Sequence, residues 1–106
     1  MISFAIGVVA GLTMTQAAIN APRSAFLDCL KQASNQATAQ KIAPDQYSAF
    51  AMQQCAAAAD KFKSALINFD VKNGIKRAQA TADSQMMVDD FVAMSADKYK
   101  ATTSPR

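Results

Sequence analysis

Hydrophobic and polar positions along the chain repeat mostly with the period of an α-helix, and no strand-like alternation is present. A first helix is predicted from Ser24, a suitable N-cap, to about Ala43, because the residue before a proline is disfavoured in a helix. Its apolar positions form one narrow stripe: Phe26, Leu30, Ala33 and Ala37.

A second, longer helix is predicted over residues 44–72. Pro44 suits a first helical position and Asp45 favours the helix dipole, whereas Asn73 and Gly74 supply a left-handed cap at the far end. Its apolar positions fall on one broad face: Tyr47, Phe50, Ala51, Cys55, Ala58, Phe62, Ala65, Leu66 and Phe69.

A third helix is predicted over about 75–100, followed by a polar tail expected to be disordered from about residue 101. Its apolar arc is wider and less regular: Ala78, Ala82, Val88, Phe91, Val92, Met94 and Tyr99. The fold class expected is therefore all-α, a small three-helix domain over residues 18–106 in which the first two helices form an antiparallel hairpin.

The two cysteines of the chain lie at equal distances from the expected hairpin turn near Ile42. Antiparallel helices with equal rise per residue would bring Cys29 and Cys55 to the same height, which predicts a disulfide. Such a bond would stabilise a small domain by roughly 3 to 4 kcal/mol. A redox or metal-binding thiol pair is less favoured because no CxxC motif or further soft ligand is present; two free thiols in a cytosolic protein are the remaining alternative.

The N-terminal segment suggests a compartment. Residues 2–14 are uncharged and mostly apolar, as in the central region of a secretory signal, so residues 1–17 are expected to be removed and the protein to be periplasmic or secreted. The alternative is a retained membrane anchor reaching about residue 20, with Gly7 and Gly11 available for close contact with another helix.

The composition argues against enzymatic chemistry. Histidine and glutamate are both absent, and no nucleophile, phosphate-loop or haem-attachment motif occurs. We therefore expect no catalytic residue, cofactor or metal. The net charge of +3 is too small and dispersed to indicate nucleic acid.

Three groups of residues remain as candidate partner-binding positions. A basic cluster at the second turn, which could face an anionic membrane or an acidic protein, contains Lys72, Lys76 and Arg77. An acidic arc on the third helix contains Asp83, Asp90 and Asp97, and a soft apolar patch beside it contains Met87, Phe91 and Met94. Solvated charges, helix-dipole compensation and ordinary core packing are the simpler interpretations.

These observations together predict an exported, non-enzymatic helical binding protein with a protein partner. A membrane-anchored accessory subunit is the alternative if the N-terminal helix is retained.

Overall fold

The computed structural model describes the backbone of residues 2–103 and the side chains of residues 18–103. Over this range the chain is all-α, as predicted, and contains four α-helices and one short 3-10 helix. The elements are α1 (Ile2–Gln40), η1 (Pro44–Gln46), α2 (Tyr47–Gln54), α3 (Ala56–Lys72) and α4 (Arg77–Thr103). The side chains of the expected signal segment, residues 1–17, are not described, and the expected contact face at Gly7 and Gly11 lies within that segment. Cleavage of the segment stays a prediction.

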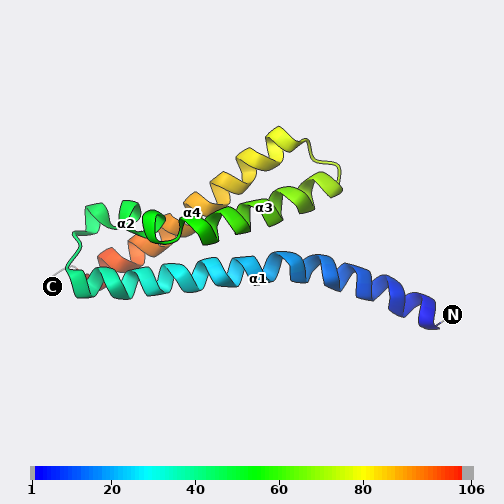
Figure 1. Ribbon diagram of the computed structural model, residues 1–106, viewed down its shortest axis with the longest axis horizontal. Coiled ribbons are helices and arrows are strands. Elements are labelled where there is room, and N and C mark those ends of the chain that lie inside the picture. Colours follow the sequence, from blue (N-terminus) through cyan, green and yellow to red (C-terminus); the bar gives the residue numbers. More distant parts are fainter. Residues whose placement is uncertain (1, 104–106) are drawn as a thin grey trace.

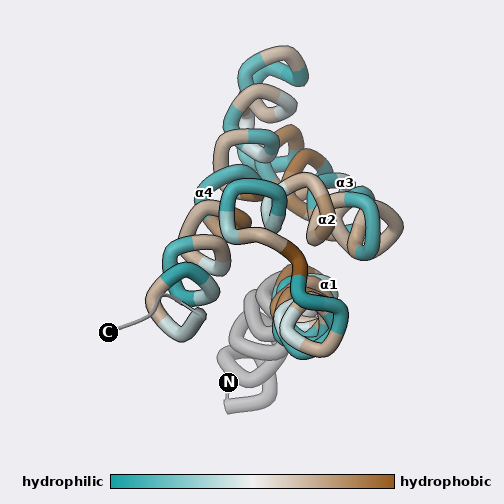
Figure 2. The backbone as a smooth tube through the Cα atoms, turned by 90° about the vertical axis from the view of Figure 1, so that its left-hand side faces the viewer, coloured by the Kyte–Doolittle hydropathy of each residue, from teal (hydrophilic) through white to brown (hydrophobic). Residues whose placement is uncertain are grey.

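The helices form an elongated bundle of 62 × 31 × 23 Å (Figure 1). Helix α1 runs along its whole length, and α2 and α3 return beside it, which gives the predicted antiparallel hairpin. Helix α4 packs against all three, and the view in Figure 2 separates α1, the α2–α3 arm and α4.

Helix α1 begins much earlier than predicted. Residues 18–23, which precede the predicted helix, are themselves helical, and Pro22 lies inside the helix, so Ser24 is not an N-cap. Flanking alanines favour the helix, and Ile19, only 9% exposed, packs into the core. This tertiary contact offsets the backbone hydrogen bond that proline cannot donate.

The turn after α1 is close to its predicted position. Helix α1 ends at Gln40, and Lys41 adopts a left-handed conformation with φ 59°. The Ile42 N–H then donates to the Ala37 carbonyl at 2.9 Å, which closes a Schellman-type cap. Lysine occupies a position that glycine usually fills.

The predicted helix over 44–72 is broken at Cys55. Pro44–Gln46 form a 3-10 turn, and Cys55 has φ −112° and ψ 18°, which separates α2 from α3. No proline or glycine lies in residues 47–72, so no local residue predicts the break. The Gln54 carbonyl oxygen lies 3.7 Å from the Cys29 sulfur, at the point where the disulfide joins the two arms.

The turn between α3 and α4 matches its prediction. Gly74 has φ +92°, and the Ile75 N–H donates to the Asp70 carbonyl at 2.9 Å. The Asn73 side chain adds a hydrogen bond from Nδ2 to the Phe69 carbonyl at 2.8 Å. Helix α4 then continues through Thr103, beyond the expected end at residue 100.

The core confirms the predicted stripe of α1 and confirms that of α4 in part. All four α1 positions are buried, and so are Tyr47 and Ala51 on α2, Phe62 on α3, and Cys55 at the junction between them. On α4, Val88, Val92 and Tyr99 are buried as predicted. Ala78, Ala82 and Met94 are exposed, however, and Ala80 and Ser84 are buried instead. Alanines occur on both faces of α4, so the pattern did not show which of them is buried. Ser84 satisfies its hydroxyl locally by donating to the Thr81 carbonyl at 2.8 Å.

Candidate functional site

The predicted disulfide is present and fastens α1 to the junction of α2 and α3. The Cys29 and Cys55 sulfurs are bonded, with a Cα–Cα distance of 5.8 Å, and Cys55 is only 1% exposed. The bond is compatible with an oxidising, extracytoplasmic compartment. Its position inside the packed core makes it a structural staple.

A groove lies between α1 and α4 on the side away from α3. Its volume is about 960 Å³, and its apolar side chains are Leu27 and Leu30 from α1 with Phe91 and Met94 from α4. The remaining lining residues are polar or charged: Asp28, Lys31, Ser34, Asn35, Ser95, Asp97, Lys98 and Thr102.

The floor of the groove is held by aromatic packing beneath it. The Phe91 ring lies 6.3 Å from Phe26 and 5.9 Å from Phe62, and Phe26 and Phe62 stack at 5.8 Å. The three rings come from α1, α3 and α4, so they fix the spacing of the groove walls.

A hydrogen-bond network supports the other end of the groove. The buried Tyr47 hydroxyl lies 2.6 Å from the Ser95 Oγ and donates to the Leu30 carbonyl at 3.3 Å. It thereby links α2 to both walls of the groove, through Leu30 on α1 and Ser95 on α4. The groove is therefore built on the rigid part of the molecule.

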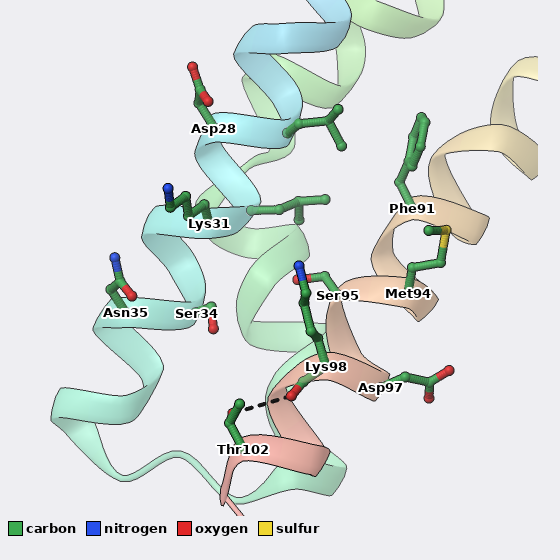
Figure 3. Close-up of a pocket in the computed structure, with 12 residues that line it drawn as sticks. Asp28, Lys31, Ser34, Asn35, Phe91, Met94, Ser95, Asp97, Lys98 and Thr102 are labelled. Carbon is green, nitrogen blue, oxygen red and sulfur yellow. Dashed lines mark hydrogen bonds between the residues drawn. The ribbon is translucent and has the colours of Figure 1, made fainter.

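The charged residues of the groove point in different directions (Figure 3). Asp28, Lys31 and Asn35 project outward from α1, and Asp97 projects away on the far side of α4. Lys98 instead points into the space between the two helices. It is the charged side chain most directly placed to meet a molecule in the groove.

The structure places the predicted apolar patch in two environments. Phe91 and Met94 line the groove, together with Asp97, whereas Met87 does not. Phe91 is half-buried and belongs mainly to the core, but Met94 is 63% exposed. The α1 wall of the groove was not predicted. Leu27 lies beside the predicted core stripe of α1, and only the pairing of α1 with α4 brings Leu27 near Met94.

The residues of the predicted acidic arc differ in their surroundings. Asp83 accepts a hydrogen bond from the Gln79 Nε2 at 2.8 Å, and Asp89, six residues further along α4, accepts one from the Gln85 Nε2 at 2.9 Å. Asp90 is exposed, and Asp97 lies at the groove. No group of side chains in residues 18–103 is arranged to hold a metal ion.

The predicted basic cluster remains together at the α3–α4 turn. Lys72, Lys76 and Arg77 are all exposed there. Lys63, which precedes this cluster on α3, is instead engaged within the fold. Its Nζ donates to the Gln85 Oε1 at 3.0 Å and lies 3.6 Å from the Asp60 Oδ1.

The chain was compared with models of protein families, with curated proteins and with solved structures, and none of them matches it. Among the helices of the described part of the chain, none is long and apolar enough to cross a membrane. The anchor alternative concerns residues 2–20, whose side chains are described only from Ala18, and it stays a prediction.

Proposed function

We propose that the protein is an exported, non-enzymatic binding module that holds an amphipathic helix of a partner protein in the groove between α1 and α4. The observation that carries this proposal is the groove itself, where apolar side chains stay accessible beside a complete core. Leu27 is 40% exposed and Met94 63% exposed, although Leu30 between the walls is nearly fully buried.

A helix is the occupant that this shape favours. Helices α1 and α4 are neighbours with a space between them. Together with the α2–α3 arm they make up three members of a four-helix arrangement, and the space is left for the fourth. A helix of about 10 Å diameter with apolar residues at i, i+3, i+4 and i+7 would cover the apolar floor and leave its polar face in water.

The position of Lys98 favours a partner with a particular charge. Lys98 lies between the walls (Figure 3), and the described residues place no carboxylate within ion-pair distance of it. A carboxylate on the edge of the partner helix, next to its apolar face, would pair with Lys98. Such a contact contributes mainly to orientation and specificity.

Export is proposed from two independent features. The uncharged apolar run at residues 2–14 has the character of a secretory signal, and the disulfide needs an oxidising environment to persist. Lack of histidine and glutamate supports a role in binding rather than catalysis.

The experiment uses two synthetic amphipathic helices that share the same leucine positions but carry aspartate or lysine along the edge of the apolar face. We expect the acidic peptide to bind and to shift the amide resonances of Leu27, Met94 and Ser95, with little change at Met86. Met86 is a matched reference because it lies on α4 and is 61% exposed but outside the groove.

Two variants complete the test. Leu27→Asp should abolish peptide binding, and Lys98→Glu should reverse the preference toward the lysine-edged peptide. Equal binding of both peptides, or resonance shifts centred on Met86, would contradict the proposal.

A further inference from the structure

The turn between α3 and α4 carries positive charge and an exposed apolar side chain at one end of the bundle. We infer that this turn docks on an anionic membrane surface, with Lys72, Lys76 and Arg77 facing lipid phosphates and Ile75 entering the interface. This interaction goes beyond the proposed groove function and uses a different part of the molecule.

The charges of the turn are not neutralised within the fold. Lys72, Lys76 and Arg77 are exposed, and the described part of the chain gives none of them an ion-pair partner. Asp70 is the only carboxylate between Asp60 and Asp83 in the sequence. The turn therefore presents a local excess of positive charge to solvent.

Helix electrostatics explain only one of these cations. Lys72 lies in the last turn of α3, where positive charge favours the helix dipole. Lys76 and Arg77 lie at the start of α4, where the dipole disfavours cations, and the first turn of α4 contains no acidic residue. Their positions oppose local helix stability, which favours an external role.

Ile75 is presented by a well-defined backbone. Gly74 in a left-handed conformation and the Ile75 N–H bond to the Asp70 carbonyl fix the turn, yet the Ile75 side chain remains 40% exposed. An apolar residue between basic residues matches the amphipathic interface of a bilayer, where apolar side chains enter the acyl boundary and cations stay among the headgroups.

The position of the turn also agrees with a membrane partner. Followed back from Gln40, α1 leads to the same end of the molecule as the α3–α4 turn (Figure 1). The uncharged apolar run of residues 2–14 belongs to that end of the chain. If it is retained, it would hold the turn near a bilayer; if it is removed before Ala18, a new positively charged amino group arises at this end.

The test uses the absence of tryptophan from the chain. An Ile75→Trp variant of the full chain, purified from an exporting host, carries a single fluorescent reporter in the turn. We expect its emission to move to shorter wavelength with vesicles of phosphatidylcholine and phosphatidylglycerol, and to stay unchanged with phosphatidylcholine alone. Met94→Trp places the reporter away from the turn and should show no shift with either vesicle.

Two charge variants in the Ile75→Trp background assign the effect to the turn. The first is a triple variant that combines Lys72→Gln, Lys76→Gln and Arg77→Gln. It should weaken vesicle partitioning roughly 100-fold, because each basic residue near an anionic surface strengthens binding about fivefold. The second is a control that combines Lys31→Gln, Lys41→Gln and Lys100→Gln. It removes the same charge from the other half of the molecule and should change partitioning only slightly.

Three results would overturn the inference. These are an unshifted Ile75→Trp emission with anionic vesicles, equal shifts for the two reporters, and equal losses for the two charge variants. Circular dichroism of each variant confirms that the exposed substitutions leave the helices intact.

Discussion

Tyr47 and Tyr99 stack with their ring centroids 4.5 Å apart and their planes inclined by 14°. The Tyr99 hydroxyl donates to the Ile42 carbonyl at 2.6 Å, so the C-terminal part of α4 is attached to the turn between α1 and η1. Both side chains are almost fully buried, and their contacts reach α1, α2 and α4. This pair fixes the end of the bundle opposite the basic turn and sets the separation of the groove walls.

Removal of either hydroxyl should therefore destabilise the fold without removing ring packing. We expect Tyr99→Phe to lower the free energy of unfolding by about 1 kcal/mol, because the partly buried Ile42 carbonyl loses its partner. Tyr47→Phe should cost a similar amount by leaving Ser95 unpaired. Urea denaturation followed by circular dichroism measures both, and unchanged midpoints would show that water replaces these bonds at no cost.

The disulfide should supply a large share of the stability of this small domain. Cys29→Ala with Cys55→Ala is expected to lower the free energy of unfolding by roughly 3 to 4 kcal/mol, mainly by restoring conformational freedom to the unfolded chain. Reduction of the parent protein should have a comparable effect. A double variant with the denaturation midpoint of the oxidised parent would contradict the role of the bond as a staple.

The two left-handed residues that end α1 and α3 offer a matched pair. Lys41→Gly should stabilise the protein by up to about 1 kcal/mol, because glycine adopts this conformation without the steric cost that a side chain incurs. Gly74→Ala should destabilise it by about 1 kcal/mol for the same reason, since an added Cβ at Gly74 meets no other atom within 4 Å and only the backbone strain remains. Thermal melting of the two variants should shift in opposite directions.

The apolar patch predicted on the last helix should separate into core and surface. We expect Phe91→Ala to cost about 3 kcal/mol, because its ring packs against Phe26 and Phe62. Met94→Ala and Met87→Ala should each change stability by less than about 0.5 kcal/mol. If Met94→Ala proved as destabilising as Phe91→Ala, the groove would be part of the core rather than a binding surface.

The sequence predicted those features that depend on local pattern or simple geometry. The stripe from Phe26 to Ala37, the cap at Gly74 and the pairing of Cys29 with Cys55 follow from helical period, left-handed conformation and equal rise. Each of these depends on at most two neighbouring helices.

The errors have a common physical origin in tertiary packing. Burial of Ile19 stabilises helix around Pro22, and the break at Cys55 lies where the disulfide joins α1 to the α2–α3 arm. On α4, Val88, Val92 and Tyr99 were predicted correctly, but the alanine-rich pattern did not show that Ala80 is the buried alanine near its start. The groove depends on the pairing of α1 with α4, so Leu27 could not be paired with Met94 and Lys98 in advance.

The most direct test of the proposed binding groove is site-specific photocross-linking in an exporting host, with a photoreactive amino acid at Met94 or Met86. The two positions lie on one helix with 63% and 61% exposure, but only Met94 lines the groove. We predict one discrete adduct from the Met94 position alone, and its loss in the Leu27→Asp variant. The partner segment in that adduct should be an amphipathic helix with a carboxylate beside its apolar face. Equal adducts from both positions, or none from Met94, would contradict the account.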